Sequence, residues 1–326
     1  MIITVTPNPS IDRTVTLPGE LVRGAVHRAT AVSSEPGGKG VNVARALTLA
    51  GLDTVAVLPA GEDDAFLAAL RIQRVRFHAV PVSGAVRTNL AITENDGTTT
   101  KINEPGSELS AAETAELTRA VLERAQFAQW VVLSGSLPPG LPDSWYSDMV
   151  DLLLPYGCKV AVDTSDAPLA ALAAGLDRAA PDLIKPNSEE LAGLAGVTAE
   201  SLEAALSQGD TSPVVSASRR LLDRGVGAVL ATLGAAGAVL VDHDGAWLAT
   251  PPPVRPRSTV GAGDSALAGY VRADVSGAGP QARLQMAVAY GSAAAALPGS
   301  ALPSPAQLNL DDVVVTSVTD PREGVA

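Results

Sequence analysis

The sequence has 326 residues, of which 46% are hydrophobic and 18% charged, a composition typical of a globular protein with a sizeable core. Its 23 basic and 35 acidic residues give a net charge of −12, which argues against binding to nucleic acid or anionic membranes. The single cysteine, Cys158, excludes an internal disulfide, and the three scattered histidines form no zinc motif. Because the start does not resemble a signal peptide and no apolar run reaches ~18 residues, we expect a cytoplasmic protein.

Short apolar or β-branched runs alternate along the chain with longer segments rich in alanine and leucine. The runs predict strands at 2–6, 54–59, 130–133, 159–162, 183–185, 228–232 and 238–241. The longer segments predict helices at 41–50, 111–126, 142–154, 188–195, 212–224, 262–274 and 281–296. Because most of the strands are continuously apolar, both of their faces are expected to be covered. The alternation therefore predicts an α/β fold with a mostly parallel central sheet.

Two stretches, at about 10–35 and 83–105, interrupt this alternation with polar–apolar patterns that end in turn signals such as Asn95-Asp96-Gly97. We interpret both as antiparallel excursions from the main sheet that form a small β-sheet lid. The predicted organisation is one domain over residues 1–318 that includes this lid, followed by a loose tail at 319–326.

The most informative motif is TVGAGD at residues 259–264, where a turn of small residues leads directly into a predicted helix. Backbone N–H groups and the positive end of the helix dipole converge there, which favours binding of an anion. Asp264 at this point is a candidate for accepting a proton from an attacking hydroxyl. The alternative is a plain glycine-rich turn in which Asp264 caps the helix.

A second glycine-rich motif, PGGKG at residues 36–40, precedes the predicted helix that contains Asn42. Its glycines allow a ligand to approach the backbone, and Lys39 adds a positive charge for a phosphate. The spacing is not that of a P-loop, and a diglycine turn that only starts a helix is the alternative.

A third motif, KPNSEE at residues 185–190, lies where a predicted strand ends and a helix begins. The oxygens of Asn187 and Glu190 suit Mg²⁺ that keeps much of its water near phosphates. Ordinary helix capping by Asn187 with a first-turn glutamate is the alternative.

Weaker signals support ligand binding elsewhere in the chain. Asp12 follows the first strand and is a candidate acceptor for sugar hydroxyls, with a turn-forming aspartate as the alternative. Arg87 and Lys101 lie on the predicted lid strands and can close over an anion, or can simply be solvated. The segment from Thr232 to Gly237 is compatible with a nucleotide wall or with a simple hairpin.

Taken together and in this order, the motifs resemble those of the ribokinase-like (phosphofructokinase-B) carbohydrate kinases over residues 1–315. Within that family, the opening TPNPSID at residues 6–12 is similar to the start of 1-phosphofructokinases and tagatose-6-phosphate kinases. The resemblance implies a three-layer α/β/α domain whose β-sheet lid pairs with a second copy to form a homodimer. It also implies ATP and Mg²⁺ as cofactors and a sugar phosphate as substrate.

The resemblance further implies a role for each candidate residue. Asp264 becomes the catalytic base, and the N–H groups of Gly261, Ala262 and Gly263 form the anion hole. The residues implied to bind the sugar phosphate are Asp12, Gly38, Lys39, Asn42, Arg87 and Lys101. Those implied to serve the nucleotide are Lys185, Asn187, Thr232, Gly234 and Gly237, with Glu190 and Asn187 organising Mg²⁺, the latter through water.

Lysine at position 39 is similar to 1-phosphofructokinases, whereas fructose-6-phosphate-specific relatives tend to have a further glycine there. We therefore expect phosphorylation of fructose 1-phosphate to fructose 1,6-bisphosphate. The alternatives are a tagatose-6-phosphate kinase or 6-phosphofructokinase, and, from another class, a non-catalytic regulator that binds sugar phosphate or nucleotide. The chain departs from the family near Asp64 and over residues 70–77, where usual glycines are missing; this concerns the geometry of the lid.

Overall fold

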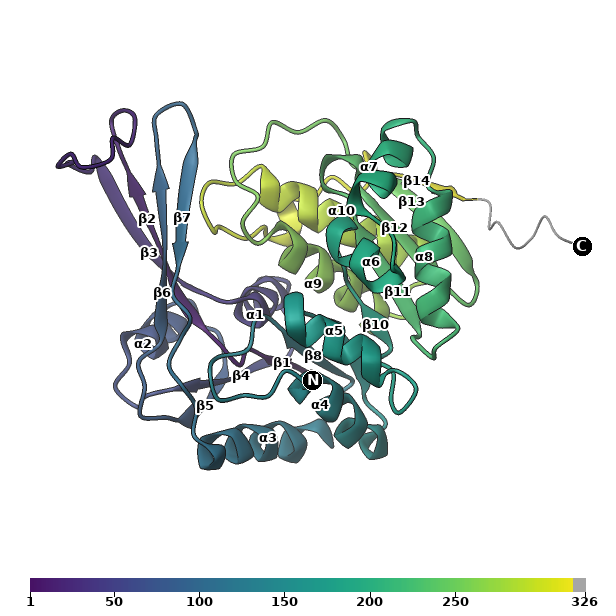
Figure 1. Cartoon of the computed structure of the whole chain (residues 1–326), viewed down its shortest axis with the longest axis horizontal. Helices are drawn as coiled ribbons and strands as arrows, with labels where there is room; N and C mark the ends of the chain where they lie inside the picture. The colour runs from purple at the N-terminus through teal and green to yellow at the C-terminus, as the bar shows by residue number, and fades with distance from the viewer. Residues whose placement is uncertain (319–326) are drawn as a thin grey trace, which may run out of the picture.

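The structure, a computed structural model, describes residues 1–318 and contains one ten-stranded sheet and one four-stranded sheet (Figure 1). The predicted tail at 319–326 lies outside the described residues. The large sheet has the order β14-β13-β12-β11-β10-β9-β8-β1-β4-β5. Its strands are β1 (Ile2–Val5), β4 (Thr54–Ala60), β5 (Phe77–Pro81), β8 (Trp130–Ser134), β9 (Lys159–Asp163), β10 (Leu183–Ile184), β11 (Ala228–Thr232), β12 (Ala238–Asp242), β13 (Gly245–Thr250) and β14 (Val314–Ser317).

The strands from β5 to β11 are mutually parallel, and β12, β13 and β14 add an antiparallel edge. Helices cover both faces, as expected for parallel strands joined by crossovers. One face carries α1 (Lys39–Leu49), α9 (Ala262–Val275) and α10 (Pro280–Ala295), and the other carries α3 (Ala111–Ala125), α4 (Trp145–Leu153), α5 (Asp166–Gly175), α6 (Ser188–Ala195) and α8 (Ser212–Leu222). The two large apolar clusters lie on opposite faces of the sheet. The predicted three-layer α/β/α fold is thereby confirmed.

The four-stranded sheet, called the small sheet below, stands away from the body of the molecule (Figure 1). Its order is β3-β2-β6-β7, with β2 (Ser10–Thr16), β3 (Ala31–Gly37), β6 (Arg87–Thr93) and β7 (Thr99–Asn103). The predicted antiparallel pairing is correct within β2–β3 and within β6–β7, but β2 and β6 pair in parallel. The reason is that both leave the same edge of the large sheet, β2 after β1 and β6 after β5, and therefore run in the same direction.

Sequence patterns missed β5, β13, β14 and the helices α2 (Ala65–Ile72), α5 and α7 (Ala199–Ser207). The α2 region is the one that departs from the family. Asp64 caps α2 by accepting from the N–H of Phe66 at 2.9 Å, and its other oxygen accepts from the N–H of Val86 at 3.0 Å. After α2, Arg74 adopts a left-handed backbone with φ of 57°, a conformation that glycine adopts more easily. No helix within residues 1–318 is long and apolar enough to cross a membrane.

Candidate active site

The candidate site lies where the carboxyl ends of the parallel strands meet the amino ends of α1 and α9. Ligands of open α/β sheets usually bind at this edge. The three predicted motifs arrive there from distant parts of the chain: residues 36–40 start α1, residues 185–190 join β10 to α6, and residues 259–264 start α9. The fold therefore brings the predicted chemistry to one edge of the sheet.

Asp264 is the third residue of α9 and has only 7% of its surface exposed. The helix begins after Gly261, whose left-handed φ of 76° turns the chain into the first turn. The hydrogen bonds between the turns of α9 begin with the N–H of Ser265, which donates to the carbonyl of Gly261 at 2.8 Å. The N–H groups of Gly263 and Asp264 precede it and so do not take part in the helical pattern. The alternative in which Asp264 is the capping residue is wrong, because Gly261 holds that position.

The pKa of Asp264 is raised to about 6, mainly by burial and next by the nearby charge of Asp163. Lys39, a hydrogen bond from Asn42, and Lys185 act in the opposite direction. A carboxylate with a pKa just below neutrality is ionised at physiological pH and yet holds a proton more firmly than an exposed aspartate. Such a group is suited to general base catalysis.

Asn42 connects the first turns of α1 and α9. Its amide donates to the Asp264 carboxylate at 2.8 Å, and its own carbonyl oxygen accepts from Arg45 at 3.3 Å. Arg45 is in turn paired with Glu35 at 3.3 Å and donates to the carbonyl of Pro36. Because Arg45 can only donate, it fixes the orientation of the Asn42 amide so that the NH₂ group faces Asp264.

Lys39 and Lys185 converge on Asp163, a residue that the sequence analysis did not single out. The ammonium of Lys39 lies 2.8 Å from one oxygen of the Asp163 carboxylate, and that of Lys185 lies 3.2 Å from the other. Burial lowers the pKa of Lys39, but the charges of Asp163 and Asp264 raise it above its ordinary value. The sequence signal that could have identified Asp163 is its position directly after the apolar run 160–162.

Asp12 owes its position to Gly37. A Cβ atom on Gly37 would lie only 2.2 Å from an oxygen of the Asp12 carboxylate, so any other residue there would displace that carboxylate. Asp12 lies inside β2 and accepts from Ser10 at 2.8 Å and from Asn89 at 3.0 Å, which rules out a turn-forming role. Gly38 caps α1 with a φ of 101°, and a Cβ there would contact Thr6. The glycines of this motif are thus required by packing; their contact with substrate stays a prediction.

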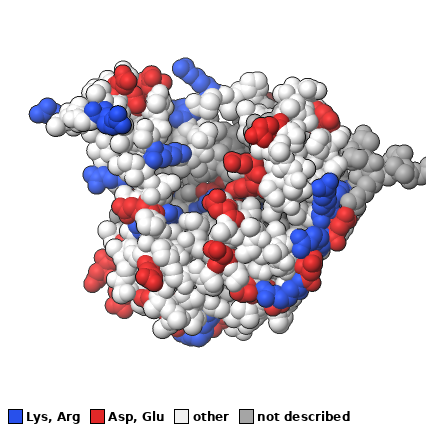
Figure 2. All heavy atoms as spheres, in the orientation of Figure 1, with Lys and Arg blue, Asp and Glu red and all other residues white. Residues whose placement is uncertain are grey.

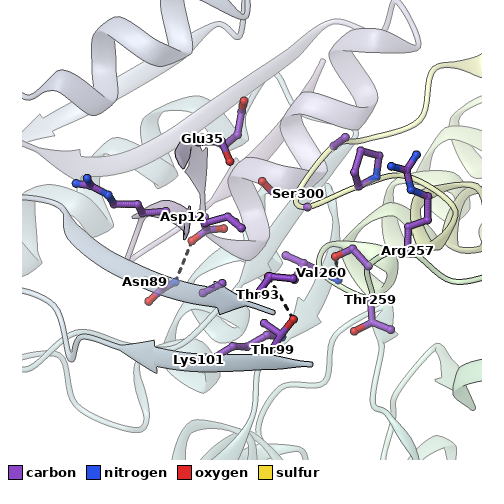
Figure 3. Close-up of a pocket in the computed structure, with 18 of the residues that line it drawn as sticks. Asp12, Glu35, Asn89, Thr93, Thr99, Lys101, Arg257, Thr259, Val260 and Ser300 are labelled. Carbon is purple, nitrogen blue, oxygen red and sulfur yellow. Dashed lines mark hydrogen bonds between the residues drawn. The ribbon is translucent and has the colours of Figure 1, made fainter. Parts of the chain in front are cut away.

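A cavity of about 1230 Å³ lies between the polar face of the small sheet and the loops that precede α9 and follow α10. Figure 2 shows this hollow, with both basic and acidic residues around it. Asp12, Asn89 and Lys101 line it from the small sheet, and Thr259 and Val260 line it from the α9 side (Figure 3). The hollow therefore ends beside the α9 motif that contains Asp264.

Arg87 connects the small sheet to the body. Its guanidinium donates to the carbonyls of Glu104 at 2.9 Å and Asn8 at 3.3 Å, and to the hydroxyl of Ser136 at 3.3 Å. Its Nε atom is buried without a hydrogen-bond partner in the described part of the chain. Arg87 thus retains a free donor.

Asn187 and Glu190 form a reciprocal capping box at the start of α6. The Asn187 side chain accepts from the N–H of Glu190 at 2.8 Å, and one Glu190 oxygen accepts from the N–H of Asn187 at 2.8 Å. In the protein without ligands, Asn187 and Glu190 therefore act as a helix cap, as the capping alternative predicted. The second oxygen of Glu190 has no hydrogen bond within residues 1–318, so the capping contacts leave an oxygen for a hydrated cation.

The segment from Thr232 to Gly237 is the antiparallel turn between β11 and β12, as the hairpin alternative predicted. Thr232 pairs with Asn187 through an isolated β-bridge, which places this turn beside the start of α6. A Cβ on Gly237 would lie 1.9 Å from the carbonyl oxygen of Ala249, and Gly234 has a φ of 59°. Packing and backbone conformation explain both glycines; a nucleotide contact stays a prediction.

Comparison with known proteins identifies the family of the chain. Residues 6–307 match the pfkB family carbohydrate kinases, and the chain belongs to that family. Its members are phosphotransferases that act on a hydroxyl group. The chain is 38% identical to the 1-phosphofructokinase of Xanthomonas campestris over 83% of each chain. It is 36% identical to that of Rhodobacter capsulatus over 94% of each chain.

Solved structures show the same fold. Phosphofructokinase-2 from Escherichia coli, in complex with substrates and products, is 31% identical with a TM-score of 0.84, over 94% of this chain and 96% of the other. Ribokinase from Thermotoga maritima, at 18% identity and a TM-score of 0.72 over 94% and 97%, shares the fold alone. The ribokinase-like architecture is thereby confirmed.

Proposed function

We propose that the protein transfers the γ-phosphoryl group of ATP to fructose 1-phosphate, giving fructose 1,6-bisphosphate and ADP. The observation that carries the proposal is the buried Asp264 carboxylate at the amino end of α9. It lies beside the unbonded N–H groups of Gly263 and Asp264 and near two lysines. An acceptor hydroxyl beside Asp264 would be in line with a phosphoryl group bound at the helix end.

In this mechanism the oxygen of the acceptor hydroxyl attacks the γ-phosphorus, the bond to ADP breaks, and Asp264 takes the hydroxyl proton. The N–H groups of Gly261, Ala262 and Gly263 stabilise the charge on the transferring group, and that of Ala262 leaves its 3.4 Å bond to the carbonyl of Thr259 to do so. Such reactions depend mainly on positioning and electrostatics, because the protein contributes little covalent chemistry. Asp12 and Asn42 would hold the sugar, and Lys39, Arg87 and Lys101 would bind the phosphate of the substrate. Gly38 would let the substrate approach the backbone.

Mg²⁺ fits the residues around the start of α6. The described residues contain no group of three or more His, Cys, Asp or Glu side chains arranged to hold a metal ion. Mg²⁺ commonly binds to one or two protein oxygens, water and substrate phosphates, so the free oxygen of Glu190 and the Asn187 region suffice. Bound Mg²⁺ would neutralise charge on the nucleotide phosphates, with Lys185, Thr232, Gly234 and Gly237 lining the nucleotide.

The preference for fructose 1-phosphate rests on Lys39 and on the names of the relatives. The alternatives remain tagatose 6-phosphate and fructose 6-phosphate, since a relative from Escherichia coli named ATP-dependent 6-phosphofructokinase isozyme 2 is 33% identical. The cavity of about 1230 Å³ is large enough for any of the three.

A coupled ADP-release assay with MgATP and the three hexose phosphates in parallel tests the proposal. We expect kcat/KM for fructose 1-phosphate to exceed the others by ~100-fold, which corresponds to about 2.7 kcal/mol. A preference for one of the 6-phosphates would contradict the assignment of fructose 1-phosphate as the substrate, but the assignment of the protein as a sugar-phosphate kinase would stand. No turnover with any of them would leave the binding-only regulator as the better interpretation.

The small sheet also supports a homodimer. Val32, Val15 and Ile92 are aligned across three strands on the face opposite Asp12, and Ile102 on the same face is 55% exposed. A second copy that packs face to face would cover these side chains. Sedimentation should show a dimer that Ile102→Asp weakens, whereas the polar-face variant Thr93→Asp should stay dimeric. A monomeric wild type would contradict the proposed homodimer.

The cytoplasm, where ATP is available, is the proposed location of the protein.

A further inference from the structure

Asp163 is a wholly buried carboxylate at the end of β9, between two ammonium groups. Lys39 donates to one oxygen at 2.8 Å. Lys185, whose side chain is 5% exposed, lies 3.2 Å from the other oxygen as an ion pair. Within residues 1–318, Asp163 is the only carboxylate that pairs with either lysine. Both cations therefore depend on one anion for their placement.

The two lysines come from different elements, and the charges of both act on Asp264. Lys185 rests against the α9 turn, since a Cβ on Gly263 would lie 3.2 Å from its ammonium nitrogen. Lys39 is the first residue of α1, in the same turn as Asn42, which bonds to Asp264. Asp163 lies between the two lysine side chains because it ends β9, a central strand of the sheet. Together the two lysines and two aspartates are electrically neutral at neutral pH, which makes their shared burial tolerable.

We propose that Asp163 is a positioning residue: its carboxylate holds the ammonium groups of Lys39 and Lys185 in place beside the anion hole and away from Asp264. The inference rests on the proposed kinase function. If Asp163 lost its charge, both ammonium groups would be free to turn toward Asp264, whose charge acts on Lys39 more strongly than that of Glu190. They would then neutralise the base instead of the phosphoryl group.

The charge of Asp163 also acts on the base directly. The charged groups that face Asp264 are Lys39 from α1, Lys185 from the end of β10 and Asp163 from β9. The pKa of Asp264 is raised to about 6; burial is the largest cause of this rise, and the charge of Asp163 is the second largest. Removing the Asp163 charge and freeing the lysines both lower this pKa. The two effects therefore add, and the sign of the change is fixed.

Asp274 provides a matched control at the other end of β9. Its side chain is 5% exposed and also lies between two cations, Lys159 at 2.8 Å and Arg283 at 3.0 Å. It accepts in addition from the indole of Trp130 at 2.8 Å. Asp274→Asn therefore removes a buried carboxylate of the same kind without altering the charges around Asp264.

The experiment compares Asp163→Asn with Asp274→Asn in the full chain. Aspartate carboxyls labelled with ¹³C, with Asp264 assigned through Asp264→Asn, give the pKa of the base without substrate. In Asp163→Asn we expect this pKa to fall by about one unit and kcat to fall ~10²-fold or more. In Asp274→Asn we expect both to stay as in the wild type, whatever the loss of thermal stability.

A second variant separates charge from position and serves if Asp163→Asn does not fold. Asp163→Glu keeps the charge but moves the carboxylate by one methylene, so we expect kcat to fall while the pKa of Asp264 stays raised. The proposal is overturned if Asp163→Asn behaves like Asp274→Asn in both readouts, or if Asp163→Glu has the wild-type kcat. Absence of turnover in the wild type would instead overturn the proposed function, and the ¹³C titration would still decide the role of Asp163.

Discussion

The amide of Asn42 donates to the carboxylate of Asp264 at 2.8 Å and joins two helix starts that are 222 positions apart in the sequence. The bond favours the ionised form of Asp264, whereas burial and Asp163 favour the protonated form. The candidate base thus has a pKa set by opposing contacts from different elements. Changing one contact at a time should move it in a known direction.

Asp264→Asn should lower kcat by ~10²- to 10⁴-fold, because the amide cannot accept the hydroxyl proton. Since Asn has nearly the same shape, KM for both substrates should change little. Steady-state kinetics with MgATP and fructose 1-phosphate measure this, with circular dichroism as the control for folding. Turnover within threefold of the wild type would contradict the assignment of Asp264 as the base.

The same variant should be more stable than the wild type above pH 6. A carboxyl whose pKa rises on folding contributes its stability below its unfolded pKa and loses it as the pH rises through the folded value, here about 6. The wild type therefore loses up to about 3 kcal/mol between pH 4 and pH 8 through this group. Urea unfolding at both pH values should show Asp264→Asn gaining stability relative to the wild type only at pH 8.

Asn42→Ala should raise the pKa of Asp264 above 6 and shift the acid limb of the kcat profile to higher pH, because it removes a donor that favours the ionised form. The direction is opposite to that expected for Asp163→Asn. The phosphate of the substrate also titrates near pH ~6, so the measured quantity is the difference between variant and wild-type profiles. A shift to lower pH would show that the hydrogen bond does not act on the base as described.

Gly37→Ala should raise KM for the sugar phosphate by ~10-fold or more, because the new Cβ would displace the Asp12 carboxylate from its present position. KM for ATP should stay unchanged, since Asp12 is proposed to bind only the sugar. Gly279→Ala is the control, because a Cβ at Gly279 meets no atom within 4 Å and that residue starts α10 away from the site. Equal effects on both KM values would indicate general damage to α1.

Glu190→Gln should increase the Mg²⁺ concentration needed for half-maximal activity by about tenfold. Glutamine can still accept from the N–H of Asn187 and so retains most of the capping box. Glu189→Gln makes the same change one position earlier in α6 and should leave the Mg²⁺ requirement unaltered. If both variants behaved alike, the effect would come from the charge at the helix start and not from a contact with the metal.

Much of the fold followed from local patterns. The buried strands of the large sheet are continuous apolar runs, and the runs at 54–59, 130–133 and 159–162 correspond closely to β4, β8 and β9. Short or half-exposed elements such as β5 and β14 were missed because packing against neighbours, more than local composition, makes them strands. The parallel pairing of β2 with β6 was also missed, since it depends on where β1 and β5 end in the sheet.

The sequence by itself determined the family, the parallel α/β architecture and the two glycine-rich helix starts that carry Asn42 and Asp264. These are encoded in contiguous residues, where backbone freedom, helix starts and apolar periodicity are local properties. Only the tertiary structure decided that Lys39 and Lys185 share Asp163, that Asn89 holds Asp12, and that the free protein uses Asn187 and Glu190 as a cap. The physical reason is that a charge or a hydrogen bond depends on distance in space, which strand order sets and sequence spacing does not reveal.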